Sequence, residues 1–146
     1  MMKVLSAAGK VTEKDSKTNI DHKFNVSKSA KRLVVEFSYS PKNVENESNS
    51  LELIEKGLKK YKTESENPSD FLPIRNLLTL SFDENKKYRG ACHRHPNEQK
   101  ITISNENSTP GIINKEIESG EWNAVLNVHF AGCEVEYSIE IEEEQI

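Results

Sequence analysis

Apolar residues recur at every second position in several runs of this chain, and this alternation constrains the fold more than any other feature. One run carries Leu33, Val35, Phe37 and Tyr39 on a single face. Further runs repeat the pattern with Ile74, Leu78, Leu80 and Phe82; Ile101 and Ile103; Trp122, Ala124, Leu126, Val128 and Phe130; and Cys133, Val135, Tyr137, Ile139 and Ile141. A period of two gives each strand one buried and one wet face, which is typical of antiparallel sheets.

Short strands separated by turn signals predict a mainly β fold. We expect an antiparallel β-sandwich, jelly-roll or immunoglobulin-like, with about eight strands. Thr109-Pro110-Gly111 favours a type II turn, because proline presets φ and glycine accepts a positive φ. Ser119-Gly120 marks another turn. Only Ala131-Gly132 separates the last two runs, so we expect these runs to pair as a hairpin, with the strands of Trp122 and Tyr137 forming the central pair.

One segment departs from this period and predicts a short helix over about residues 50–61. Its apolar residues, spaced three and four apart as on one helix face, are Leu51, Ile54, Leu58 and Tyr61. The polar stretches at about 43–49 and 62–70 are expected to be mobile loops. The chain has 146 residues, the usual size of one domain, so residues 1–146 are expected to form a single β-sandwich domain.

Charge and hydropathy argue against two classes of partner. The chain has 20 basic and 24 acidic residues without a long basic run, and the net charge is −4, so we expect no nucleic acid partner. No segment approaches the roughly 18 apolar residues of a membrane span, and the first ten residues are too weakly apolar for a signal peptide. We therefore expect a cytoplasmic protein, in which Cys92 and Cys133 are reduced thiols.

The stretch from Thr109 to Trp122, which begins Thr-Pro-Gly and ends Gly-Glu-Trp, resembles a motif of certain bacterial metallohydrolases. These are the CehA/McbA-like members of the PHP (polymerase and histidinol phosphatase) superfamily, whose motif lies in a β-rich region ahead of the catalytic domain. Arg89-Gly90 and then Ile101–Ser104 precede the motif in the family's order. The similarity covers roughly residues 20–142.

Two departures limit what the resemblance implies. Ile112 stands where the family has an aromatic residue, and residues 114–119 lack the family's prolines and glycines, so this loop is expected to be more flexible. The chain ends about where the family's catalytic barrel starts. The resemblance therefore implies an accessory β-domain standing alone: a non-catalytic binding or interaction module without a cofactor. Its partner is expected to be a protein, such as a separately encoded hydrolase, or a glycan.

An alternative interpretation makes the protein a small metal-dependent hydrolase that uses His93 and His95. His-x-His on a strand places both imidazoles on one face, which suits zinc or iron, and a third ligand could come from His129 or Cys133. The segment from Tyr88 to His95 also resembles the metal-binding opening of the family's barrel, but Ala91 replaces its aspartate. Only 51 residues follow His95, too few for such a barrel.

Other readings of the same segment stay open beside this one. Tyr88 and Arg89 form a candidate binding surface, because they can stack on a sugar or pair with an anion. Cys92 is a candidate nucleophile with His93 or His129, although neighbours on a strand point to opposite faces. A structural or oligomeric domain, pairing through its edge strands, is the third interpretation.

Overall fold

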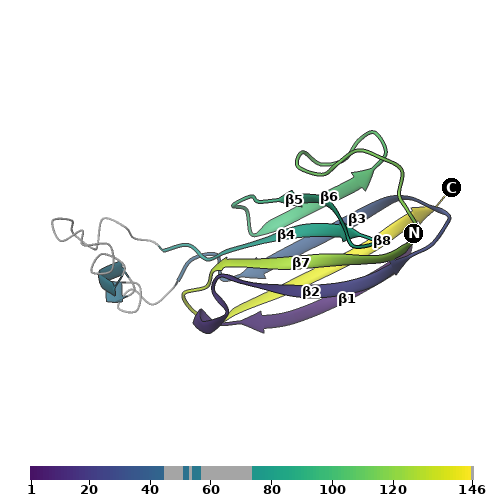
Figure 1. Cartoon of the computed structure of the whole chain (residues 1–146). Coiled ribbons are helices and arrows are strands. Elements are labelled where there is room, and N and C mark those ends of the chain that lie inside the picture. Colours follow the sequence, from purple (N-terminus) through teal and green to yellow (C-terminus); the bar gives the residue numbers. More distant parts are fainter. Residues whose placement is uncertain (45–50, 53, 57–73, 146) are drawn as a thin grey trace.

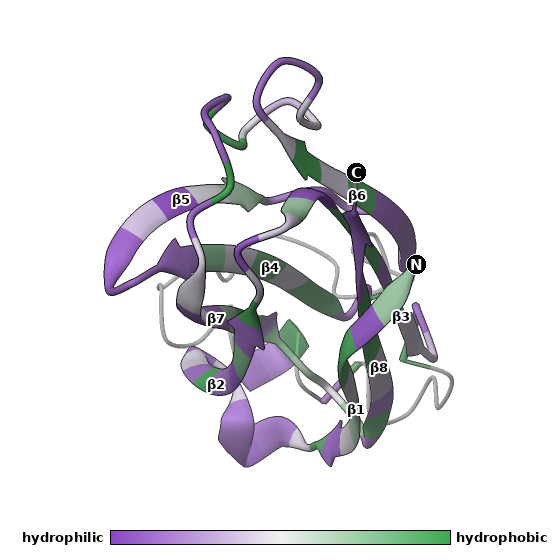
Figure 2. Ribbon diagram, turned by 90° about the vertical axis from the view of Figure 1, so that its right-hand side faces the viewer, coloured by the Kyte–Doolittle hydropathy of each residue, from purple (hydrophilic) through white to green (hydrophobic). Residues whose placement is uncertain are grey.

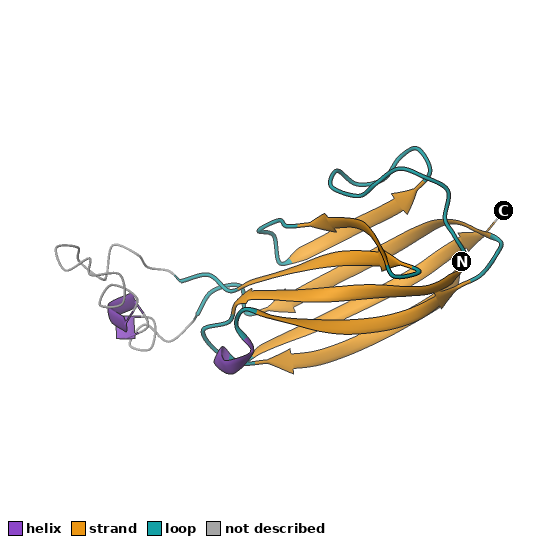
Figure 3. Ribbon diagram, viewed as in Figure 1, coloured by secondary structure: helices purple, strands orange, loops and turns teal. Residues whose placement is uncertain are grey.

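The computed structural model describes residues 1–44, 51–52, 54–56 and 74–145. The described residues form eight strands in two four-stranded antiparallel sheets stacked face to face (Figures 1 and 3). The strands are β1 (Met2–Val11), β2 (Thr18–Val26), β3 (Ala30–Ser40), β4 (Leu77–Glu84), β5 (Lys87–Cys92), β6 (Glu98–Ser104), β7 (Gly120–Phe130) and β8 (Val135–Gln145), with a 3-10 turn, η1 (Glu13–Asp15), after β1. The predicted mainly β sandwich is confirmed.

The strand order is that of a jelly roll. One sheet has the order β1-β8-β3-β6 and the other β2-β7-β4-β5. Strand β1 pairs with β8, β2 with β7, β3 with β6 and β4 with β5, so the chain is one long hairpin wound around the core. In an immunoglobulin fold the first two strands share a sheet, whereas here β1 and β2 lie in different sheets.

The predicted hairpin between the last two runs is wrong. Strand β7 pairs with β2 and β4, β8 pairs with β1 and β3, and the chain passes from one sheet to the other at residues 131–134. Trp122 and Tyr137 therefore lie on inner strands of opposite sheets and not on a central pair. Asn76, which is fully buried, fixes this corner. Its Oδ1 accepts a 2.9 Å hydrogen bond from Gly132 N, and its Nδ2 donates one of 2.9 Å to the carbonyl of Pro41.

The core lies between the inner faces of the two sheets, where the predicted apolar faces meet. Figure 2 looks along the strands from the end that carries both termini and shows hydrophobic and hydrophilic residues alternating along them. Trp122 is completely buried, with its ring centroid 6.2 Å from that of Phe24 on the neighbouring strand. The predicted core residues Leu33, Val35, Phe37, Leu78, Leu80, Phe82, Ile101, Ile103, Leu126, Ile139 and Ile141 are all buried.

The predicted helix and loops fall mostly outside the described residues. Leu51, Glu52 and residues 54–56 are helical, and an ion pair of 3.8 Å joins Lys56 to Glu52 one turn away. The rest of the predicted 50–61 helix, the 62–70 loop and residues 45–49 of the other loop are not described. Asn43 forms an isolated β-bridge with Arg75, so this part of the 43–49 loop is paired. Within the described ranges, no helix has the length and apolarity needed to cross a membrane.

Candidate functional site

A buried side chain, that of Arg89, binds the second half of the connection between β6 and β7, residues 105–119. Arg89 Nε donates a 2.9 Å hydrogen bond to the carbonyl of Ile113, and Nη1 donates one of 3.2 Å to the carbonyl of Glu116. Nη2 donates to the carbonyls of Ser104 and Lys115. A guanidinium carries five N–H donors in a planar fork, and here it clamps residues 113–116 of the connection to the end of β6.

A buried carboxylate, that of Glu84, balances the charge of Arg89. Its Oε2 accepts hydrogen bonds from Arg89 Nη1 at 2.8 Å and from the backbone N–H of Glu118 at 3.0 Å. Its Oε1 lies 2.8 Å from the Nζ of Lys115. Burial raises the pKa of Glu84, but the hydrogen bonds from Lys115, Glu118 and Arg89 outweigh it and leave the pKa below its ordinary value. Glu84 is therefore ionised at neutral pH.

Glycines let the connection approach β5 closely. Gly90, at φ +146°, forms an isolated bridge with Ile112, and the N–H of Ala91 donates a 3.1 Å hydrogen bond to the carbonyl of Gly111. The predicted turn is present, since Ile112 N donates to the carbonyl of Thr109 at 3.0 Å and Gly111 has φ +103°. The residues that carry the family resemblance thus form one structural unit, in which Arg89-Gly90 receives the Thr109–Trp122 segment.

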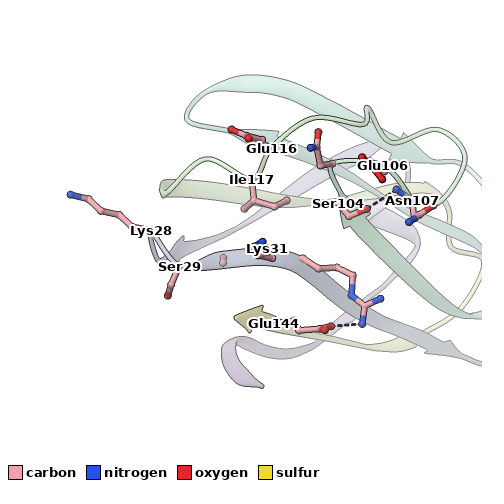
Figure 4. A pocket seen from close by; sticks show the side chains of 12 residues that line it. Lys28, Ser29, Lys31, Ser104, Glu106, Asn107, Glu116, Ile117 and Glu144 are labelled. Carbon is pink, nitrogen blue, oxygen red and sulfur yellow. Dashed lines mark hydrogen bonds and ion pairs between the residues drawn. The ribbon is translucent and has the colours of Figure 1, made fainter. Parts of the chain in front are cut away.

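This clamped connection forms one wall of a depression at the end of the sandwich, which we call the end depression. Its volume is about 610 Å³, and it is lined by Lys28, Ser29, Ala30, Lys31, Arg32, Ser104, Asn105, Glu106, Asn107, Glu116, Ile117 and Glu144. Figure 4 shows Ile117 projecting from the connection toward the strand that carries Lys31. Arg32 is ion-paired with Glu144, which Figure 4 shows at the lower edge of the end depression.

The side of the end depression that carries Ser104 and Asn107 is ordered by short-range hydrogen bonds. The Ser104 hydroxyl accepts a 2.8 Å hydrogen bond from the N–H of Asn107, and the Ser108 hydroxyl donates one of 2.9 Å to the carbonyl of Ser104. Nearby, the buried carboxylate of Glu143 accepts hydrogen bonds from the N–H and hydroxyl of Ser27. Burial raises the pKa of Glu143, but these hydrogen bonds and one from Gln145 outweigh it and lower the pKa.

The predicted binding surface of Tyr88 and Arg89 is corrected by the structure. Tyr88 is 61% exposed on β5, but Arg89 is completely buried. The guanidinium lies 5.5 Å from the Trp122 ring centroid and donates to Glu84 and four carbonyls, so it has no donor to offer a ligand. Neither Tyr88 nor Arg89 lines the end depression.

The two candidate metal ligands have different surroundings. Strand β5 ends at Cys92, so the expectation that His93 and His95 share a strand face is wrong. Both residues are exposed. The Nδ1 of His93 lies 2.8 Å from the Thr79 hydroxyl, which also lies 2.8 Å from the Nε2 of His129. In the described part of the chain, no group of three or more His, Cys, Asp or Glu side chains is placed to hold a metal ion.

The cysteines have the environments of structural residues. Both are free thiols, and Cys92 is buried in the core, where burial raises its pKa despite the opposing charge of Arg94. A raised pKa leaves less of the reactive thiolate, which opposes the nucleophile hypothesis for Cys92. The Sγ of Cys133 lies 3.5 Å from Nδ2 of Asn76 at the corner between the sheets.

The sequence contained a signal for the buried carboxylates. Glu84 follows Leu80 and Phe82 at the same two-residue period, and so continues the inward face of its strand. Glu143 continues the face of Ile139 and Ile141 in the same way. A charged residue at an inward position requires a buried partner, and the sequence does not indicate which residue that partner is.

No protein-family model matches the chain, and a search of curated proteins finds no match to it.

Proposed function

We propose that this protein is a non-catalytic binding module that recognises a hydrophilic segment of a partner protein in the end depression. The observation that supports this most is the Arg89 clamp, which holds the 105–119 connection as a preformed wall. Binding sites are commonly carried by loops that a rigid scaffold positions. A wall that is ordered before binding reduces the entropy lost on association.

The lining of the end depression supports a polar, charged partner. The lining includes three basic side chains, Lys28, Lys31 and Arg32, and three acidic ones, Glu106, Glu116 and Glu144. Serine hydroxyls and the amides of Asn105 and Asn107 add donors and acceptors, and Ile117 supplies the apolar contact. None of the lining residues is aromatic, which favours a peptide segment over a glycan, because aromatic rings supply the flat apolar faces on which sugar rings stack.

The resemblance to the accessory domain of PHP-type metallohydrolases suggests where this partner belongs. On that reading the partner is a hydrolase encoded separately from this domain. Free thiols at Cys92 and Cys133 support a cytoplasmic setting, where thiols stay reduced.

Affinity capture with charge-reversed variants tests the proposal. The end-depression variant carries Lys28→Glu and Lys31→Glu, and the matched control carries Lys14→Glu and Lys87→Glu. All four lysines are exposed, and neither control residue lines the end depression. Proteins captured from native lysate are identified by mass spectrometry, and the purified candidate is titrated into each variant by calorimetry. We expect the control to bind like the wild type and the end-depression variant to bind at least about tenfold more weakly.

Two results would contradict the proposal. Equal affinity of the wild type and both variants would place recognition elsewhere on the surface. The second result has two parts: no protein is captured, and on a glycan array the wild type binds whereas the end-depression variant does not. This result would keep the binding site but identify a glycan, and not a protein, as the ligand.

A further inference from the structure

Three side chains from separate segments meet on the outer face of the β2-β7-β4-β5 sheet. Thr79 lies on β4 and His129 on β7, while His93 directly follows β5. Thr79 points away from the core, since its neighbours Leu78 and Leu80 face inward, and yet it is completely buried. The two imidazole rings, with centroids 5.3 Å apart and an interplanar angle of 80°, cover it.

Both rings direct a nitrogen at the same oxygen atom. Thr79 Oγ1 lies 2.8 Å from Nδ1 of His93 and 2.8 Å from Nε2 of His129. A hydroxyl has one proton to donate, so only one ring accepts from it and the other must donate its own N–H. Asn127 Nδ2, 3.4 Å from the same oxygen, adds a long contact from the neighbouring position on β7. The Thr79 oxygen and the two imidazole nitrogens are thus grouped before any ligand binds.

The two oxygen-to-nitrogen distances fit the ligand shell of an octahedral transition metal ion. Metal–nitrogen bonds are about 2.0–2.1 Å long, so two ligands at right angles to one another, as in an octahedral shell, are about 2.9 Å apart. The measured oxygen-to-nitrogen distances of 2.8 Å are close to this spacing. Neutral imidazole is a preferred ligand of nickel, copper and zinc.

The neighbourhood leaves room for further ligands. His93 and His129 border a shallow depression of about 250 Å³, also lined by Lys17, Thr18, Asn19, Asn127 and Val128. The depression offers space for water molecules in the remaining coordination positions.

We propose that His93 and His129, with the hydroxyl of Thr79 as a third donor, form a surface site for one divalent transition metal ion, Ni²⁺ or Zn²⁺ being suitable probes. Binding requires the proton of His93 on Nε2 and that of His129 on Nδ1, so that Nδ1 and Nε2 face the ion. This site does not involve the end depression. Strand β7 separates the two, because Gly120 follows the clamped connection and His129 lies near the other end of the strand.

Titration calorimetry of the untagged full chain with NiCl₂ and ZnCl₂ tests the site. We expect the wild type to bind one equivalent and His93→Ala or His129→Ala to weaken binding by at least about tenfold. His95→Ala and His22→Ala are the matched controls and should bind like the wild type. Thr79→Ser keeps the hydroxyl and should retain binding, whereas Thr79→Val keeps the shape and should weaken it. Thermal melts establish that each variant is folded.

A second readout locates the ion directly. Paramagnetic Ni²⁺ should broaden the imidazole NMR signals of His93 and His129 at concentrations that leave those of His22 and His95 sharp. The proposal fails if the wild type shows neither heat nor selective broadening, or if His129→Ala binds as tightly as the wild type. Loss of binding in His95→Ala with retention in His129→Ala would also overturn it, in favour of a His93–His95 pair.

Discussion

The guanidinium of Arg89 donates a 2.8 Å hydrogen bond to the carboxylate of Glu84, and the two side chains are 0% and 1% exposed. Taking two opposite charges out of water is costly, and the cost is offset only when the remaining donors and acceptors are satisfied. Here the remaining donors bind backbone carbonyls of the β6–β7 connection. The ion pair is thus the point at which the end wall of the sandwich is attached to its core.

Replacing Arg89 by methionine should destabilise the protein by about 3–5 kcal/mol, because the buried Glu84 carboxylate and several carbonyls lose their partner. The matched control is Arg94→Met at an exposed position, which should change stability by less than about 0.5 kcal/mol. Urea unfolding followed by circular dichroism measures both. Combining Arg89→Met with Glu84→Gln should cost less than the sum of the two single changes. Strict additivity would mean that the pair is not coupled.

Acid should destabilise the fold through Glu84 and Glu143. Hydrogen bonds lower the pKa of each below the ordinary value of 4.5, despite burial, which raises it. The unfolded chain then binds more protons, so this stability is fully present above pH 4.5 and is lost as the pH falls through the lower folded pKa values. Urea midpoints measured from neutral pH down to about pH 3 should fall less steeply in Glu84→Gln and Glu143→Gln. If the urea midpoint falls as steeply with decreasing pH in both variants as in the wild type, the acid destabilisation comes from other carboxylates.

Trp122→Ala should cost about 3–5 kcal/mol, since the ring is completely buried between the sheets. Trp122→Phe keeps most of the apolar contact but loses the 2.8 Å hydrogen bond from Nε1 to the carbonyl of Glu118, so it should cost less. Differential scanning calorimetry of the three proteins gives the comparison. Near-normal stability of the alanine variant would show that the inward face of β7 is misassigned.

Gly90→Ala should destabilise the protein by about 1–3 kcal/mol or more. Gly90 has φ +146°, and a Cβ there would lie 2.5 Å from the carbonyl oxygen of Gly111 and 2.6 Å from Cα of Ile112. These are backbone atoms of the clamped connection, so relief requires moving the connection itself. In Gly9→Ala the atoms nearest to the new Cβ belong to the far end of the Tyr137 side chain, with Oη at 2.8 Å, and a shift of that side chain relieves the contact. If Gly90→Ala and Gly9→Ala lower the melting temperature by the same amount, the expected difference in stability between the two variants is wrong.

The alternation of side chains predicted which faces are buried, but not which strands are neighbours. Leu126 and Ile139 are both buried as expected, although their strands lie in different sheets. A hairpin and a corner between sheets bury the same residues, so periodicity alone does not distinguish them. The sequence does not predict strand β1, because this edge strand lacks the alternation of large apolar residues. It has small residues at Ala7, Ala8 and Gly9 and buries little surface.

The candidate sites were harder to predict because they depend on contacts between distant segments. Charged residues are mostly exposed, so the sequence predicts Arg89 at the surface, and only the folded chain brings Glu84 to it. Likewise, the sequence pairs His93 with His95 by proximity, whereas folding brings His129, 36 positions further on than His93, to the same hydroxyl. Motif spacing describes neighbours along one strand, whereas each of these sites is assembled from three separate segments of the chain.

The bridge between Asn43 and Arg75 has a consequence for how this domain tolerates change. Backbone hydrogen bonds from Val44 N to Ile74 O and from Asn76 N to Lys42 O, at 2.9 and 2.7 Å, fasten the chain on both sides of the bridge. These bonds hold the backbones of residues 42–44 and 74–76 side by side. Because the cost of closing a chain between two fixed points grows only slowly with the number of residues between them, we expect this bridge to persist when residues are inserted between Val44 and Ile74. The bridge therefore marks a position at which the domain should accept an inserted sequence.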